Sequence, residues 1–320
     1  MKNTNLSLVE AASETVYAHL QASPQICWPL LCARAGCEVY VKHENHNPTG
    51  AFKVRGGLTF MQELKWAHPN ITNVITATRG NHGQSISYAA ARMGLKATIV
   101  VPDGNNPESS AAMRAYGADV VEHDHDFQAA YEHCEALGNE LGAFMVHPFN
   151  PWLLKGVSTY AWELFTSVPD LDAVYVPIGL GSGICSTIAM RDALGLKTEV
   201  IGVNSENAPA YALSFDQGKP VSTETADTIA DGIACRVPIA GAVERICAGA
   251  SRIVQVSDAQ ILDAMSAIFS DTRNLAEGAG AAPFAALLKE KDKMKGKKVA
   301  FILSGGNCYR SLAQRVLAQD

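Results

Sequence analysis

Short β-branched runs alternate with helix-length segments along almost the whole chain. The strands expected from these runs are 38–42, 73–77, 97–101, 119–122, 173–176, 199–203, 252–256 and 298–303. Several of the runs are continuously apolar, which is typical of strands covered by helices on both faces. The helices expected between them include 83–93, 107–116, 127–141 and 259–269. Such alternation indicates an α/β fold with doubly wound, mainly parallel sheets, whose ligands bind beyond the carboxyl ends of the strands.

Length and charge narrow the class of protein. A chain of 320 residues is long enough for two domains of ordinary size. The net charge of −6 argues against a nucleic-acid partner, because phosphate binding needs a basic face. The most apolar stretch, 173–190, contains Pro177 and three glycines, so we expect no membrane helix. The N-terminus lacks the apolar core of a signal peptide, which predicts a cytoplasmic protein.

The N-terminal sequence and the cysteines lead to two further predictions. Ser7 with Glu10 three residues later fits a capping box, so the first helix is expected to start at Ser7. The eight cysteines form no CxxC pair and mostly lie among apolar residues. We therefore expect reduced thiols in the core, without a disulfide framework or a zinc site.

Lys53 is the first candidate for chemistry. It lies in the segment Glu44–Gly56, where the turn Asn47–Gly50 leads from an expected strand to an expected helix, and Phe52 precedes it. A lysine amine can form a Schiff base with an aldehyde when desolvation or a neighbouring cation lowers its pKa. Most lysines are solvated, so the prediction depends on the whole segment and not on this one residue.

A second candidate is the strand-to-helix turn Thr78–Gln84, with the sequence Thr-Arg-Gly-Asn-His-Gly-Gln. Backbone N–H groups at the start of a helix favour an anion. His82 in this turn has two interpretations: it holds the loop in place, or it transfers protons.

Two further turns follow expected strands. Pro177–Ile184 contains three alternate glycines, which let backbone amides approach a phosphate, although many glycine-rich turns are only tight turns. Leu303–Asn307, with the sequence Leu-Ser-Gly-Gly-Asn, closes the last expected strand. On its own this second turn would be interpreted as a loop.

Glu44 together with Thr49–Gly56 (Thr-Gly-Ala-Phe-Lys-Val-Arg-Gly) resembles the lysine segment of the pyridoxal-5′-phosphate (PLP) dependent serine/threonine dehydratases. The other segments follow in the order of that family, so the resemblance covers nearly the whole chain. This is the fold-type II PLP family, which also contains serine racemase, cysteine synthase and the tryptophan synthase β chain. Val54-Arg55-Gly56 stands where cysteine synthases carry Asp-Arg, which favours the dehydratase branch.

The resemblance implies a fold-type II architecture with a large domain, 1–53 and 152–320, and a small domain, 54–151, inserted in it. It also implies a homodimer, the cofactor PLP, and Lys53 as the catalytic residue that carries it. The cofactor-binding residues that it implies are Phe52, Lys53, Asn81, Gly179, Gly181, Ser182, Gly183, Glu277 and Ser304. The substrate-binding residues that it implies are Thr78, Arg79, Gly80, Asn81 and His82.

The family pattern also suggests how the cofactor is tuned. The family's Ser, here Ser304, faces the pyridine nitrogen, and a neutral hydroxyl leaves the ring a weaker electron sink, which favours loss of a β-substituent. Leu180 and Ser182 replace glycines of the family's usual four-glycine run. Glu277 resembles a glutamate near the cofactor, with a helix N-terminal acid as the equal alternative.

Arg79 departs from the pattern, because serine racemases carry a Ser there that acts as acid and base. An arginine is a poor base, so racemisation is less favoured. A guanidinium at this place can clamp a second carboxylate, orient a β-hydroxyl, or merely brace the loop.

No metal site is expected. Asn204 and Ala210 stand where the carboxylate ligands of some relatives would be. The cluster His123–Asp126 is interpreted as a solvated turn.

We therefore expect a PLP-dependent ammonia-lyase that converts a β-hydroxy amino acid, L-threonine or L-serine, to a 2-oxo acid and ammonia. Alternatives are a dehydratase for phenylserine or 3-hydroxyaspartate and an amino-acid racemase. A non-catalytic PLP-binding protein belongs to a different class. A dinucleotide-binding protein is less favoured, because its glycine motif should follow the first strand. The chain ends soon after Ser304, so no C-terminal regulatory domain is expected.

Overall fold

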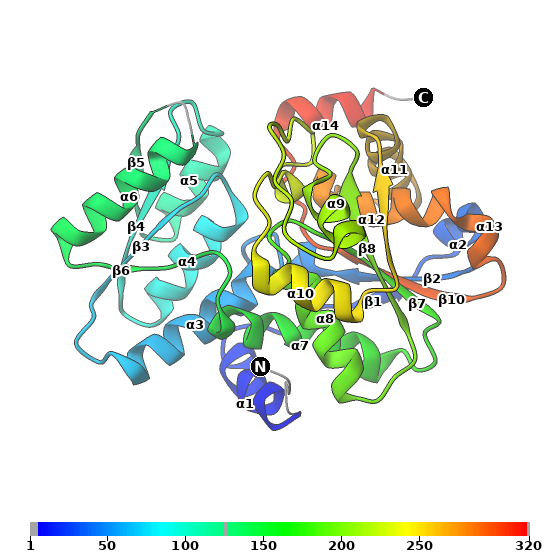
Figure 1. The fold of residues 1–320 in the computed structure, drawn as a ribbon, viewed down its shortest axis with the longest axis horizontal. Coiled ribbons are helices and arrows are strands. Elements are labelled where there is room, and N and C mark those ends of the chain that lie inside the picture. The colour runs from blue at the N-terminus through cyan, green and yellow to red at the C-terminus, as the bar shows by residue number, and fades with distance from the viewer. Residues whose placement is uncertain (1–5, 125–126, 319–320) are drawn as a thin grey trace. The chain divides into compact units, whose positions relative to one another are not determined.

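The computed structural model describes residues 6–124 and 127–318. The chain forms two compact units, each built on one sheet (Figure 1). The six-stranded unit comprises the residues up to Val9, Ala22–His46, and the chain from Ser158 onward; the four-stranded unit comprises Glu10–Gln21 and Asn47–Val157. The domain boundaries expected from the sequence stay a prediction. His125 and Asp126, half of the expected solvated turn, lie outside the described residues.

The six-stranded sheet has the order β1-β2-β10-β7-β8-β9. Its strands are β1 Gln25–Cys27, β2 Glu38–His43, β7 Ala173–Pro177, β8 Glu199–Ser205, β9 Arg252–Val256 and β10 Lys298–Leu303. Only β1 is antiparallel to its neighbour. From β7 the chain adds β8 and β9 on one side and β10 on the other, so the winding reverses between β7 and β10. The carboxyl ends of strands at such a switch point are the usual place for a ligand.

The helices of this unit surround a core in which α12 is central. They are α2 Pro29–Ala35, η1 Glu44–His46, α8 Ser182–Ala193, α9 Ala210–Gln217, η2 Asp231–Ile233, α10 Ala240–Gly249, α11 Asp258–Thr272, α12 Gly278–Lys289, α13 Lys291–Met294 and α14 Arg310–Leu317. Ten consecutive residues of α12, 278–287, are buried. A helix buried on every side is apolar all round, and its run of Ala and Gly suits this position.

The four-stranded sheet has the order β5-β4-β3-β6, and all its pairs are parallel. Its elements are α3 Lys53–Ala67, β3 Asn73–Ala77, α4 Asn81–Arg92, β4 Lys96–Val101, α5 Pro107–Ala115, β5 Asp119–Glu122, α6 Phe127–Leu141 and β6 Phe144–Met145. Two further helices, α1 Leu6–Tyr17 and α7 Pro151–Ser167, contribute residues to both units. Here the winding reverses between β3 and β6, so β3 ends at a switch point.

The α/β class and the mainly parallel sheets are confirmed, and the eight expected strands are present. The expected start of the first helix is wrong: α1 already includes Leu6, so Ser7 lies inside the helix and does not cap it. A capping box does form at α11, where the Ser257 hydroxyl accepts from the amide of Gln260.

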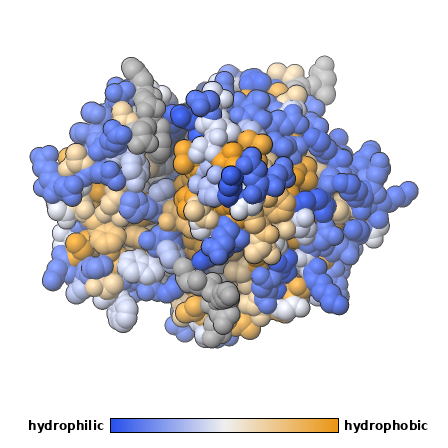
Figure 2. Space-filling model, in the orientation of Figure 1, coloured by the Kyte–Doolittle hydropathy of each residue, from blue (hydrophilic) through white to orange (hydrophobic). Residues whose placement is uncertain are grey.

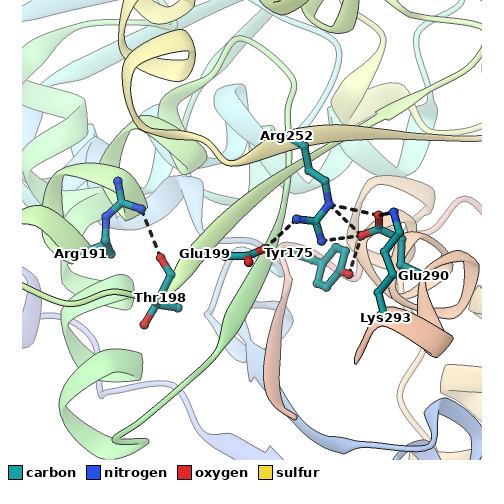
Figure 3. A network of polar contacts seen from close by, with 7 residues as sticks. All are labelled: Tyr175, Arg191, Thr198, Glu199, Arg252, Glu290 and Lys293. Carbon is teal, nitrogen blue, oxygen red and sulfur yellow. Dashed lines mark hydrogen bonds and ion pairs between the residues drawn. The ribbon is translucent and has the colours of Figure 1, made fainter. Parts of the chain in front are cut away.

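A polar network ties the end of α12 to the amino-terminal edge of the larger sheet (Figure 3). Arg252 at the start of β9 pairs with Glu199 at 2.6 Å and with Glu290 at 2.8 Å. The Tyr175 hydroxyl donates to Glu290 at 2.8 Å. Hydrogen bonds and the Arg252 cation hold the pKa of Glu290 at about 2 in spite of its burial, which by itself would raise it. The network therefore stabilises the edge opposite to the carboxyl ends of the strands.

Hydrophilic and hydrophobic residues are interspersed over the face seen in Figure 2. In the described part of the chain, no helix combines the length and the apolar character that a membrane span requires. None of the eight cysteines, all of which lie in the described residues, forms a disulfide. The expected burial is wrong for Cys27, which is exposed, and Cys32, Cys247 and Cys308 are only partly buried.

Candidate functional site

Lys53 is the first residue of α3 and is half-buried. Its Nζ atom lies 5.2 Å from the centroid of the Phe52 ring. The Ser85 hydroxyl on α4 donates a hydrogen bond of 2.6 Å to the backbone carbonyl of Lys53. A Cβ atom on Gly57 would lie 2.4 Å from that hydroxyl oxygen, so glycine is required where α3 meets α4. The backbone of Lys53 is therefore held at a fixed place against α4.

The turn Thr78–Gly80 connects β3, at the switch point, to the start of α4. The Gly80 amide donates to the Thr78 hydroxyl at 3.3 Å. Thr78 is buried and Arg79 is exposed. The amides of a first helical turn have no carbonyl one turn earlier to bind, and the helix dipole adds a positive potential. This turn is thus suited to an anion such as a carboxylate.

His82 lies in the first turn of α4 and is 7% exposed. Burial and the nearby Lys53 cation lower its pKa to about 3, although a hydrogen bond to the backbone of Val146 opposes them. The imidazole is therefore neutral near pH 7. Its Nε2 atom is buried and has no hydrogen-bond partner in the structure. The bond to Val146 holds the ring, and Nε2 remains available to a donor from a bound molecule.

The glycine turn runs from Pro177, the last residue of β7, to Ser182, the first of α8. Gly181 has a φ of +93°, a conformation that favours glycine. A Cβ atom on Gly179 would lie 2.3 Å from the Gly232 carbonyl oxygen. The Tyr211 hydroxyl donates a hydrogen bond of 2.9 Å to the carbonyl of Leu180, which holds the turn in place. The bare backbone before a helix start forms a cradle for a phosphate.

Ser304 follows β10, the strand on the other side of the switch point, and is 4% exposed. The next residue, Gly305, accepts a hydrogen bond of 3.1 Å from the Glu277 amide. A Cβ atom on Gly305 would lie 2.6 Å from Oε1 of Glu277. Glu277 precedes α12 but its side chain makes no capping hydrogen bond to that helix. Its carboxylate lies against Gly305.

The expected site residues fall into two groups. Those in the four-stranded unit are Phe52, Lys53, Thr78, Arg79, Gly80, Asn81 and His82; those in the six-stranded unit are Gly179, Gly181, Ser182, Gly183, Glu277 and Ser304. In the six-stranded unit, three separate segments meet at Gly232 of η2. Gly232 lies against Gly179, and a Cβ atom on it would be 3.6 Å from Oε1 of Glu277.

Sequence reasoning missed both Gly232 and Ser85. A glycine after Asp231 and a serine inside a helix carry no local signal of their contacts. Both are found only when the packing is known.

The residues present fit pyridoxal phosphate. A half-buried amine suits its aldehyde, the cradle at Gly179–Ser182 suits its phosphate, and the buried Ser304 suits its ring nitrogen. The orphan Nε2 atom of His82 indicates that the four-stranded unit is also shaped to receive a polar group.

Comparison with known proteins agrees with this fit. The family model "Pyridoxal-phosphate dependent enzyme" matches residues 18–305. L-threonine ammonia-lyase of Thermotoga maritima is 35% identical over 284 residues, which cover 88% of this chain and 70% of that protein. A β-hydroxyaspartate dehydratase of Paracoccus denitrificans is 33% identical over 299 residues, 93% of this chain and 94% of that protein.

Among solved structures, the processed form of threonine deaminase isoform 2 from Solanum lycopersicum superposes with a TM-score of 0.91 at 30% identity. That match covers 97% of this chain and 91% of the other. Since both the family model and full-length relatives match nearly all of it, the chain belongs to the pyridoxal-phosphate dependent enzymes, as a lyase of the dehydratase type with pyridoxal phosphate as its cofactor.

Proposed function

We propose that this enzyme eliminates water from a β-hydroxy amino acid, with L-threonine and L-serine as its substrates. The unsaturated amine that is released then takes up water, which yields a 2-oxo acid and ammonia. The observation that carries the proposal is Lys53, a half-buried amine at the first position of α3 whose backbone is fixed by Ser85. Relatives named L-threonine ammonia-lyase support the choice of substrate.

Bound PLP supplies an electron-withdrawing ring that stabilises negative charge at the substrate Cα. We assign to Lys53 the binding of the cofactor and, once its amine is freed by the substrate, removal of the Cα proton. The turn Thr78–His82 binds the substrate carboxylate, and Asn81 contacts the cofactor. The β-hydroxyl would take up a proton and leave as water, and the bond between Cα and Cβ would become a double bond.

The six-stranded unit binds the cofactor in this proposal. Gly179, Gly181, Ser182 and Gly183 hold the phosphate through backbone amides and the Ser182 hydroxyl. Ser304 would offer a neutral hydroxyl to the ring nitrogen, so that the ring would stabilise the Cα charge less strongly and loss of the β-substituent would be favoured. Glu277 positions the Ser304–Gly305 backbone. The homodimer and the cytoplasmic location remain parts of this proposal.

Replacement of Lys53 by Ala tests the assignment. The variant should lose the absorbance of the lysine-bound cofactor at the short-wavelength end of the visible range. It should also lose nearly all release of 2-oxo acid from L-threonine and L-serine. Full turnover by Lys53→Ala would show that another residue carries the cofactor. A wild-type enzyme that binds PLP but releases no 2-oxo acid from any β-hydroxy amino acid would contradict the proposed reaction.

A second candidate substrate is 3-hydroxyaspartate, and Arg79 is the observation that favours it. Arg79 is exposed in the turn proposed to bind the substrate carboxylate, where its guanidinium can pair with a second carboxylate. The relative named β-hydroxyaspartate dehydratase matches almost end to end. Arg79→Ala should then lower kcat/KM for 3-hydroxyaspartate far more than for L-threonine. Equal losses for both substrates would leave Arg79 as a brace of the loop.

A further inference from the structure

Two thiols at one end of the six-stranded sheet lie close together. Cys27 is the last residue of β1 and Cys32 lies in α2, and their sulfur atoms are 3.5 Å apart. Cys27 is exposed and Cys32 is partly buried. A disulfide needs sulfur atoms about 2.0 Å apart, so the two sulfurs must approach by about 1.5 Å to bond. The reaction assigned above uses neither thiol.

We propose that Cys27 and Cys32 form a reversible disulfide and constitute a modification site that responds to peroxide. This site is independent of the amino-acid reaction. It combines an accessible thiol, a partner within contact and a hydrogen-bond donor directed at one sulfur.

The two sulfurs have different surroundings, which assigns them different roles. The Val39 amide donates a hydrogen bond of 3.2 Å to the Cys32 sulfur, which holds that sulfur beside Cys27. We assign the first reaction to Cys32, because Cys27 is the thiol with the raised pKa. Burial, and next its hydrogen bond to Cys32, raise the pKa of Cys27 to about 11, so Cys27 remains a thiol at neutral pH and resolves the product.

In the first step the Cys32 thiolate attacks one oxygen of hydrogen peroxide. The S–O bond forms and the O–O bond breaks; the sulfur is oxidised to a sulfenic acid, and the departing hydroxide takes a proton and leaves as water. In the second step the Cys27 sulfur attacks the Cys32 sulfur. The S–S bond forms, the S–O bond breaks, and the hydroxyl leaves with the Cys27 proton as a second water. A small dithiol reverses the reaction by exchange.

The spacing of basic residues makes the product easy to identify. Trypsin cleaves after Lys2, Arg34 and Lys42, so Cys27 and Cys32 lie on one peptide and Cys37 on the next. The PLP-loaded enzyme is treated with a small excess of hydrogen peroxide, its free thiols are alkylated, and its tryptic peptides are weighed. We expect the peptide 3–34 to lose two hydrogen atoms and to take up no alkyl group. Dithiothreitol before alkylation should restore two alkylation sites.

Single variants separate the roles. Cys27→Ser should accumulate a sulfenic acid at Cys32 that dimedone traps, whereas Cys32→Ser should react with peroxide much more slowly. Cys247→Ser, which removes a partly buried thiol of α10, should form the 27–32 link as the wild type does. The proposal is overturned if both thiols of peptide 3–34 remain alkylated after peroxide, or if Cys32 becomes linked to Cys37 or to a second chain.

Discussion

The hydroxyl of Ser85 on α4 donates a hydrogen bond of 2.6 Å to the backbone carbonyl of Lys53 at the start of α3. Gly57, one turn further along α3, leaves the space that this hydroxyl needs. A residue of α4 thus fixes the backbone position of the lysine that is proposed to bind the cofactor. Precise placement of a reacting group is worth several kcal/mol in enzymes, so this contact should affect turnover as well as stability.

Ser85→Ala should lower the free energy of unfolding by about 1 kcal/mol, the usual value of one hydrogen bond, and should also lower kcat. Ser87→Ala is the matched control, because the Ser87 hydroxyl donates a buried hydrogen bond of 2.7 Å to the Gly83 carbonyl within the same helix, whereas Ser85 donates to Lys53. Urea unfolding and 2-oxo acid release measure the two effects. Equal losses of kcat in both variants would contradict a positioning role for Ser85.

Gly179→Ala should weaken PLP binding at least about tenfold, because the new Cβ atom would lie 2.3 Å from the Gly232 carbonyl and displace the turn. Gly241→Ala in α10 is the control, since no atom lies within 4 Å of a Cβ built there. Titration of each apoenzyme with PLP, followed by absorbance, gives the affinities. Circular dichroism checks that both variants are folded. Unchanged affinity in a folded Gly179→Ala enzyme would exclude this turn as the phosphate site.

His43 should make the six-stranded unit sensitive to acid. Burial, and then the neighbouring His46, lower the pKa of His43 from the ordinary 6.5 to about 4, while its Nε2 atom accepts a hydrogen bond of 2.9 Å from the Trp28 indole. Between pH 6.5 and 4 the unfolded chain binds the proton and the folded chain does not. The free energy of unfolding therefore falls as the pH falls through this window, by up to about 1.4 kcal/mol per pH unit.

His43→Gln removes the titrating group but keeps an acceptor for Trp28. Its unfolding free energy should depend less steeply on pH between 6.5 and 4 than that of the wild type. Denaturant unfolding at several pH values measures the two slopes. Identical slopes would mean that His43 takes up no proton on unfolding.

Glu290→Gln should destabilise the six-stranded unit by about 2 kcal/mol, because it removes the charge that Arg252 and the buried Tyr175 hydroxyl share (Figure 3). Lys293→Ala provides the comparison: Lys293 also pairs with Glu290, but its side chain is 67% exposed, so its loss should cost less than about 0.5 kcal/mol. Unfolding midpoints in urea distinguish the two. The KM for the amino acid should stay the same in both variants, since the network lies at the amino-terminal edge of the sheet.

Much of the fold and of the site is local in the sequence. Short β-branched runs predicted the eight main strands, and several of these runs are continuously apolar because a strand buried on both faces needs apolar side chains throughout. Glycines and small polar residues directly after those strands predicted the turns at Thr78 and Pro177, since a backbone that approaches an anion needs such residues. The pattern around Lys53 gave the family, and the family model and full-length relatives confirm it.

Other features were decided only by tertiary packing. The position of β10 between β2 and β7 brings the end of one strand beside a turn more than 120 residues earlier in the chain. Lys42 is completely buried in a strand, and its charge is tolerated because its amine pairs with Glu163 on α7 and donates hydrogen bonds to the Ser23 carbonyl and the Gln25 side chain. The meeting of Gly179 and Glu277 at Gly232, and the contact of Cys27 with Cys32, likewise depend on which elements pack together. Local composition specifies each element, but contacts between elements depend on side-chain shape across the core, which no short pattern in the sequence encodes.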